Sequence, residues 1–152
     1  MQYIDIHENQ IYIRLAVTDS QDLKLLHFSA LPLNEEDLVK EAIPEGFPFL
    51  SMNLAGFDRP YERHGNKFIV TAPGYRMKYL SHSDERNEFG RLLTFHTKDE
   101  ETGVTAASSW QFYDDLPVIR TWHTVTNNGH ETQTLDYIAN FHYERIEKEG
   151  KL

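Results

Sequence analysis

The segment Gly56–Gly65 places an aspartate, two arginines, a glutamate, a tyrosine and a histidine within ten residues flanked by glycines. Planar guanidinium groups and carboxylates make fork-like hydrogen bonds, which suit the vicinal hydroxyls of sugars. The segment is therefore a candidate sugar-binding loop. The alternative interpretation is a solvated loop in which the charged side chains pair with one another.

Other kinds of catalytic arrangement find little support in the residues. The sequence has no Gly-x-Ser-x-Gly and no cysteine, and Ser108-Ser109 has no evident Asp/His partner. Paired carboxylates could hydrolyse glycosides. However, most of the 24 acidic residues lie in turns and in the expected helix start, where solvation is the simpler explanation. The turn after Lys98 accounts in this way for Asp99, Glu100 and Glu101. We assign no catalytic role to Asp114-Asp115, and we expect no catalytic residue in this chain.

Eight histidines are present, but none shows His-x-His or His-Glu-x-x-His spacing. We interpret them as surface or strand-packing residues, and we expect neither a bound metal ion nor a cofactor. In one alternative, His82 or His123 is catalytic. An enzyme related to galactose mutarotase needs a glutamate base and a histidine acid in one cleft. In this chain, His82 or His123 would serve as the acid and a glutamate on a nearby strand as the base.

Composition and charge limit the class of protein. The 152 residues are enough for one domain, which we take as residues 1–152, and the formal net charge is −9. This charge argues against nucleic acid and anionic membranes as partners, because both require a basic surface. The N-terminus MQYIDIHENQ has no basic region followed by an apolar one, so we expect no signal peptide and a cytoplasmic location.

Alternation of apolar and polar residues dominates the chain and predicts strands. Residues 2–18 read as a hairpin, and Asn34–Ile43 reads as one short helix that ends at Pro44. Residues 44–66 are rich in proline and glycine, with one short strand near Phe49–Asn53. The remaining strands are expected at Leu23–Phe28, Lys67–Thr71, Tyr75–His82, Arg91–Lys98, Val104–Tyr113, Pro117–Thr126 and Thr132–Ile146.

Two features of these strands carry further predictions. The Asn127-Asn128-Gly129 turn favours a tight hairpin between the last two strands, because asparagine and glycine accept positive φ. Trp110 and Trp122 lie well inside neighbouring strands, and we interpret both as core residues rather than as a platform for sugar stacking. The predicted architecture is an all-β sandwich of about nine strands with one short helix.

Three motifs resemble the N-terminal domain of glycoside hydrolase family 36 α-galactosidases, and the likeness extends along nearly the whole chain. They are Gly56-Phe57-Asp58-Arg59-Pro60, the stretch Tyr75–His82, and Asp115-Leu-Pro-Val-Ile-Arg120 followed by Thr126-Asn-Asn-Gly129. The resemblance implies a β-supersandwich of the galactose-mutarotase type. It also implies a longer enzyme that cleaves terminal α-galactosides such as melibiose and raffinose with retention.

The two catalytic aspartates of that family lie in a (β/α)₈ barrel that these 152 residues do not include. The resemblance therefore implies a non-catalytic domain within a homo-oligomer, a dimer or a tetramer. In some members a loop of this domain reaches the active-site mouth of a neighbouring subunit. The matching residues are Asp58 and Arg59, with Arg63 as the alternative to Arg59, since the family more often reads Gly-x-Gly-Asp-x-Arg-x-Pro.

Two further functions remain as alternatives on the sequence alone. A stand-alone carbohydrate-binding module requires an exposed aromatic platform, so that Trp110 or Trp122 would face solvent. A small-ligand β-barrel is less consistent with the residues, because the early Gly-x-Trp of lipocalins is missing.

Overall fold

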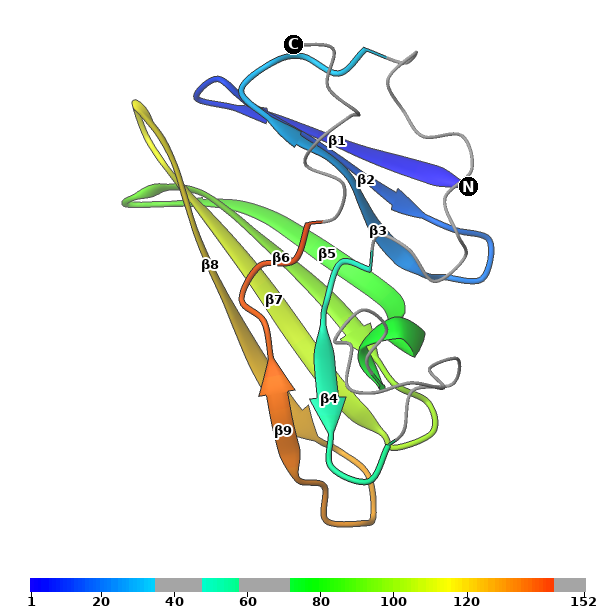
Figure 1. Cartoon of the computed structure of the whole chain (residues 1–152). Helices are drawn as coiled ribbons and strands as arrows, with labels where there is room; N and C mark the ends of the chain where they lie inside the picture. Colours follow the sequence, from blue (N-terminus) through cyan, green and yellow to red (C-terminus); the bar gives the residue numbers. More distant parts are fainter. Residues whose placement is uncertain (35–47, 58–71, 144–152) are drawn as a thin grey trace, which may run out of the picture.

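A computed structural model describes residues 1–34, 48–57 and 72–143. Within these ranges the chain forms nine β-strands and one 3₁₀ helix, and the paired strands run antiparallel. The strands make a three-stranded sheet in the order β1-β2-β3, a four-stranded sheet in the order β5-β6-β7-β8, and a separate β4-β9 pair (Figure 1). The predicted all-β sandwich class is confirmed.

The first sheet follows the predicted hairpin. β1 (Gln2–Glu8) and β2 (Ile11–Val17) pair along their full lengths, and β3 (Leu23–Ser29) pairs with the other side of β2. Asn9 and Gln10 join β1 to β2 with φ angles of 47° and 65°, the left-handed values that two-residue hairpin turns require. The alternation in β2 buries one face of that strand, which consists of Ile11, Ile13, Leu15 and Val17.

The second sheet is a meander of β5 (Lys78–Asn87), β6 (Gly90–Lys98), β7 (Val104–Tyr113) and β8 (Leu116–Asn127). All four predicted strands are present. β5 begins later than predicted, because the preceding residues form the 3₁₀ helix η2 (Gly74–Arg76).

The prediction of a long last strand over Thr132–Ile146 is wrong. β9 (Leu135–Ile138) has four residues, and residues 139–143 belong to no strand. The last part of the predicted strand, residues 144–146, lies outside the described residues. β9 pairs with β4 (Met52–Leu54) rather than with β8, so the predicted hairpin is wrong as well. The observed strand β4 overlaps the short strand predicted near Phe49–Asn53.

Hydrogen bonds at the Asn127-Asn128-Gly129 turn explain why the chain does not fold back along β8. The backbone N–H of Asn128 donates to the Gly103 carbonyl at 3.3 Å, and its side-chain Nδ2 donates to Thr105 Oγ1 at 2.9 Å. Both acceptors belong to the turn between β6 and β7 or to the start of β7. The turn is therefore attached to the neighbouring loop, and the chain leaves the four-stranded sheet at this point.

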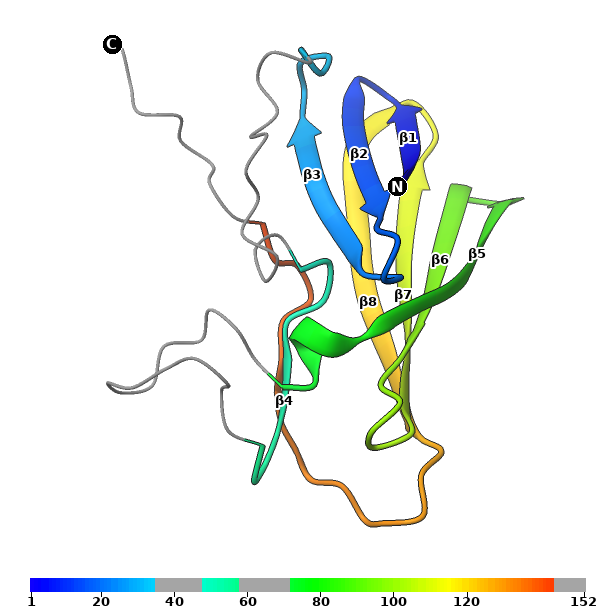
Figure 2. The ribbon, with the colours of Figure 1, turned by 90° about the vertical axis from the view of Figure 1, so that its right-hand side faces the viewer.

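The core lies between the three-stranded sheet and one face of the four-stranded sheet, and Figure 2 shows the two sheets as separate layers. Trp110 of β7 is 2% exposed, as predicted for a core residue. Its ring centroid lies 5.3 Å from Phe49, 6.0 Å from Phe95 and 6.4 Å from Phe28. Trp110 therefore joins both sheets and the segment that leads into β4.

Trp122 does not share that position, so the prediction that it is a core residue is wrong. Thr121, not Trp122, lies opposite Trp110 in the β7–β8 ladder, which places Trp122 on the outer face of the sheet. The Trp122 side chain is half-buried there, and the Arg120 guanidinium lies 5.6 Å from its ring centroid.

Two predicted elements fall outside the described residues. The helix expected at Asn34–Ile43 does so apart from Asn34, and the strand expected at Lys67–Thr71 does so entirely. Among the described residues, no helix is long and apolar enough to cross a membrane.

Candidate functional site

The described residues on the two sides of segment 58–71, which contains most of the candidate sugar-binding loop, lie close together. The backbone N–H of Phe57 donates to the Leu54 carbonyl at 3.2 Å, and the N–H of Leu54 donates to the Ala72 carbonyl at 2.9 Å. The chain thus leaves β4 at Phe57 and returns at Ala72 beside the same residue. Asp58, Arg59 and Arg63 lie between these two points, outside the described residues.

Arg76 of the 3₁₀ helix holds this end of the sandwich in place. Its guanidinium binds both carboxylate oxygens of Asp99, with Nε to Oδ1 at 2.7 Å and Nη2 to Oδ2 at 3.0 Å. Nη1 lies 2.6 Å from the carboxylate of Glu101, and the guanidinium carbon lies 5.0 Å from the ring centroid of Phe57. Arg76 therefore connects the start of the candidate loop to the turn between β6 and β7.

The Asp99 side chain is buried and both of its carboxylate oxygens accept hydrogen bonds. The prediction that Asp99 is a solvated turn residue is therefore wrong. Its side chain accepts hydrogen bonds from Arg76, from the Thr102 backbone N–H at 3.1 Å and from Thr102 Oγ1 at 2.6 Å. Burial alone would raise the pKa of Asp99, but the hydrogen bonds from Arg76 and Thr102 outweigh burial and lower it. A carboxylate held in this way fixes the turn and is not free to transfer protons.

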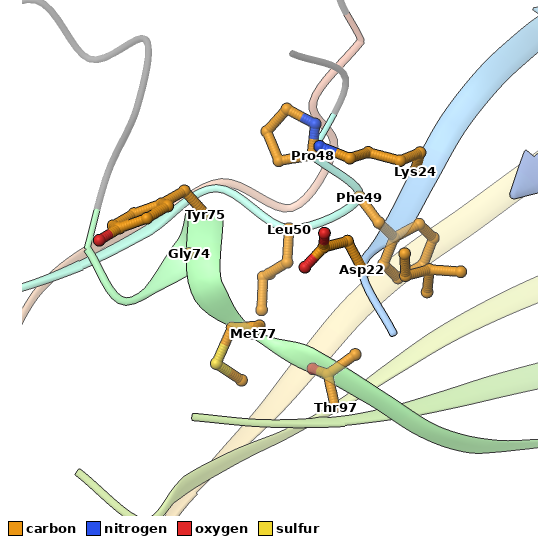
Figure 3. A pocket seen from close by; sticks show the side chains of 10 residues that line it. Asp22, Lys24, Pro48, Phe49, Leu50, Gly74, Tyr75, Met77 and Thr97 are labelled. Carbon is orange, nitrogen blue, oxygen red and sulfur yellow. The ribbon is translucent and has the colours of Figure 1, made fainter. Parts of the chain in front are cut away.

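A small cavity lies beside this anchor, between the start of β3, the segment before β4 and the 3₁₀ helix (Figure 3). Its volume is about 10 Å³, enough for about one water molecule. Sugar-sized ligands need pockets of several hundred Å³. The cavity is therefore no sugar site, and its lining comprises Asp22, Leu23, Lys24, Pro48, Phe49, Leu50, Gly74, Tyr75, Met77 and Thr97.

Ser108 and His123 form a hydrogen-bonded pair that the sequence analysis missed. Ser108 Oγ lies 2.7 Å from His123 Nδ1, and His123 Nε2 lies 3.2 Å from the carbonyl oxygen of Asn140. Since Nε2 donates to that carbonyl, Nδ1 accepts from the serine hydroxyl. Burial lowers the pKa of His123, although the carbonyls of Asn140 and Ala139 act in the opposite direction.

This pair corrects the prediction that Ser108 lacks a histidine partner, but it does not create a nucleophile. Ser108 is 0% exposed, so a substrate cannot reach its hydroxyl. His123 is oriented by a backbone carbonyl rather than by a carboxylate that would stabilise an imidazolium. The pair therefore connects β7, β8 and the segment after β9.

The arrangement needed for a mutarotase-like reaction is not formed by the described residues. His82 Nδ1 bonds the hydroxyl of Tyr79 at 2.7 Å, and the His82 ring stacks on Phe95 with centroids 5.5 Å apart. Among the described residues, His82 and His123 form hydrogen bonds with Tyr79, Ser108 and Asn140 and with no glutamate. In the same part of the chain, no group of three or more histidines and carboxylates is placed to hold a metal ion.

The outer face of the four-stranded sheet gives limited support to a carbohydrate-binding module. Trp122 faces outward, as that alternative requires, but its ring is half-buried and Arg120 lies against it. A sugar ring needs an open aromatic face, so Arg120 would have to move before Trp122 could stack on one.

Asp114 and Asp115 form the two-residue turn between β7 and β8. Asp114 pairs with Arg86, and Asp115 has a φ of 61°, as hairpin turns require. Neither carboxylate faces a cleft, since both side chains are exposed at the tip of the sheet.

Comparison with models of known protein families gives no match, and a search of curated proteins gives none either.

Proposed function

We propose that the chain is a non-catalytic β-sandwich domain of a family 36 α-galactosidase, whose longer enzyme cleaves terminal α-galactosides with retention. One observation supports this most strongly. Arg76 belongs to the motif Tyr75–His82, and it contacts Phe57, which belongs to the motif Gly56–Pro60. Two sequence motifs that carry the resemblance therefore meet in space, at the base of the loop that the family uses near the active site.

The role proposed for this domain is to present that loop. Asp58, Arg59 and Arg63 are the proposed contact residues at the rim of a neighbouring subunit's sugar site. The buried pair between Arg76 and Asp99 supports this role, because it holds Arg76 beside Phe57, where the chain enters the loop. The domain also has uncovered apolar side chains suitable for subunit contacts, among them Phe141, which is 42% exposed.

The activity of two proteins tests the proposal. The purified 152-residue chain should not hydrolyse an aryl α-galactoside, because retention requires two carboxyl groups about 5 Å apart around an enclosed sugar. A longer protein expressed from the natural gene should hydrolyse it. Turnover by the short chain that disappears with one internal Asp or Glu substitution would contradict the proposal, and so would a longer gene product without a glycosidase barrel.

A further inference from the structure

Asn128 is the single asparagine of this chain that is followed by glycine. An asparagine side chain loses its amide spontaneously when the backbone nitrogen of the next residue attacks the side-chain carbonyl carbon. Glycine permits this attack best, because it has no side chain to crowd the nitrogen and its backbone adopts the widest range of conformations. Asn128 is also exposed, so water can reach it. Among the eight asparagines of the chain, Asn128 is therefore the one best suited to deamidation.

The folded turn opposes this attack at the nitrogen. The backbone N–H of Gly129 donates to Oδ1 of Asn127 at 3.0 Å. This hydrogen bond must break before the nitrogen can lose its proton and turn toward the side chain of Asn128. Nδ2 of Asn127 donates in turn to the Glu131 carbonyl at 2.8 Å, which holds the Asn127 side chain in place. The attacking atom is therefore occupied in the folded chain.

The side chain that would be attacked is held as well. Nδ2 of Asn128 donates to Thr105 Oγ1 at 2.9 Å, and its backbone N–H donates to the Gly103 carbonyl at 3.3 Å. Space on the other side is also restricted, since an added Cβ at Gly129 would lie 2.0 Å from the Thr102 carbonyl oxygen. The Asn128 side chain must leave Thr105, and the turn must move away from Thr102, before a succinimide ring can close.

We propose that Asn128 is a site of spontaneous deamidation whose rate the folded turn controls, with the Asn127 side chain as the restraint. The Gly129 nitrogen forms a bond to Cγ of Asn128, and the bond from Cγ to Nδ2 breaks. The proton of the Gly129 nitrogen passes through solvent to the departing nitrogen, which leaves as ammonia. A water molecule then opens the succinimide at either carbonyl and gives aspartate or isoaspartate. The proposal uses no residue of the proposed α-galactosidase role and is independent of it.

Deamidation would weaken the contact between the two turns. Thr105 Oγ1 accepts from Asn128, while its own hydroxyl donates to the Thr126 carbonyl at 3.4 Å. A carboxylate at position 128 has no N–H to donate and is ionised at neutral pH. It would face a lone pair of Thr105 unless that hydroxyl gave up Thr126, and isoaspartate also adds a backbone atom beside Thr102. Either product adds one negative charge to a chain whose formal net charge is −9.

Two substitutions at Asn127 test the restraint. Asn127→Asp keeps an oxygen acceptor for the Gly129 N–H, whereas Asn127→Ala removes it, and both variants lose the donation to Glu131. At neutral pH the folded Asn127→Ala chain should deamidate about two- to tenfold faster than folded Asn127→Asp, the range that corresponds to one hydrogen bond. Mass spectrometry of the tryptic fragment of residues 121–145 measures the rate and locates the converted residue. Circular dichroism first shows that each variant is folded.

The same measurement in urea removes the folded turn and requires no substitution. The unfolded parent should deamidate faster than the folded parent, and the two Asn127 variants should then react at similar rates. Asn128→Gln is the negative control, because its longer side chain closes a ring far more slowly, so the fragment should stay unconverted. A folded parent that reacts as fast as the unfolded chain would overturn the proposal. Equal rates for the two folded Asn127 variants, or conversion at Asn140 before Asn128, would overturn it as well.

The substitution Asn128→Asp reproduces one product and tests the weakened contact. Its urea midpoint should lie below that of Asn128→Ala, because alanine loses only the donor, whereas aspartate also brings a carboxylate against Thr105. Ser81→Asp is the matched control for charge. Ser81 is exposed on β5 at the opposite edge of the sheet, so this variant should keep a midpoint close to that of the parent. An Asn128→Asp midpoint equal to or above that of the parent would overturn the inference that deamidation loosens the turn.

Discussion

At the scale of single residues, the buried polar groups of this sandwich are occupied by structural partners. Ser108 donates to His123, and the carboxylate of Asp99 accepts from Arg76 and Thr102. Each arrangement satisfies a polar group that would otherwise be costly to bury. A serine–histidine pair or a buried aspartate is therefore not evidence of catalysis unless a substrate can reach it.

His123 should make the free energy of unfolding depend on pH. Burial lowers its pKa in the folded chain, so the unfolded chain binds a proton more readily. The stabilisation is complete above the unfolded pKa of about 6.5 and is lost as the pH falls through the lowered folded pKa. We expect a smaller free energy of urea unfolding at pH 5 than at pH 7.5, and a weaker dependence in His123→Gln.

The exposed His96 provides the control for this prediction. His96→Gln should keep the pH dependence of the parent chain. If His123→Gln and the parent lose the same free energy between pH 7.5 and pH 5, the hydrogen-bonded pair with Ser108 does not carry the effect.

The two tryptophans show what the sequence could and could not predict for single residues. Both were expected in the core from their place inside strands. However, a two-residue turn at Asp114-Asp115 pairs even-numbered with odd-numbered residues, as in the Trp110–Thr121 pair. Two even-numbered tryptophans therefore lie on opposite faces, and recognising the turn length would have separated them. The pairing of Ser108 with His123 could not have been found in this way, because the turn alone would place Thr121 opposite Ser108. A register shift between Phe112 and Tyr113 moves His123 to that position.

At the scale of elements, two loops at one end of the four-stranded sheet touch through glycines. An added Cβ at Gly129 would lie 2.0 Å from the carbonyl oxygen of Thr102, and one at Gly103 would lie 2.8 Å from Gly129 Cα. Gly103 also has a φ of 74°, which favours glycine. The Asn-Asn-Gly sequence thus serves this close approach instead of the hairpin that it predicts.

Gly129→Ala should destabilise the chain by about 1–3 kcal/mol, because the Thr102 backbone must move to admit the methyl group. Gly56→Ala is the matched comparison. Gly56 has a φ of 89°, but an added Cβ meets no atom within 4 Å, so only the backbone preference is lost, about 1 kcal/mol. Chemical denaturation of the two variants measures the difference. An equal or smaller loss for Gly129→Ala would show that the two loops do not pack as described.

The strands themselves were largely predictable, whereas their partners were not. Alternation identifies β2 and the first half of β7, where buried residues alternate with more exposed ones. It carries no information on which strand lies beside which. The short β4 supplies hydrogen-bond partners for β9, and that pairing joins residues more than eighty positions apart. Local patterns therefore predict the meander β5–β8, where turns fix the neighbours, and fail for β9.

At the scale of the whole molecule, the sandwich brings together the described residues on the two sides of segment 58–71 through contacts distant in sequence. Phe57, Ala72 and Arg76 meet there, and Asp99 from another sheet turn holds Arg76. The sequence indicated the loop by its composition, but it did not show that Asp99 would bind Arg76 beside the loop. The only local signal was the turn itself, in which Asp99, Thr102 and Gly103 have the spacing of a side-chain-capped turn.

The proposed function predicts that Asp58 acts on substrate binding and not on folding. In the longer enzyme, Asp58→Ala should raise KM for raffinose with little change in Tm, because a residue whose role is to contact the sugar contributes little to stability. Loss of one charged hydrogen bond corresponds to about ten- to over a hundredfold in kcat/KM. An aryl α-galactoside has few hydroxyls outside the galactose ring, so its kinetics should change less.

The kinetics of Arg59→Ala and Arg63→Ala on the same two substrates should identify the loop arginine. Only the arginine that contacts the substrate should reproduce the selective rise in KM for raffinose when it is replaced. Glu88→Ala is the control, because Glu88 is exposed in the turn between β5 and β6, away from the loop base. Unchanged kinetics for Asp58→Ala on both substrates, with the oligomer intact, would restrict the loop to a structural role. A large fall in Tm would instead show that Asp58 pairs within the loop, because an ion pair or turn cap stabilises the fold and an exposed sugar contact does not.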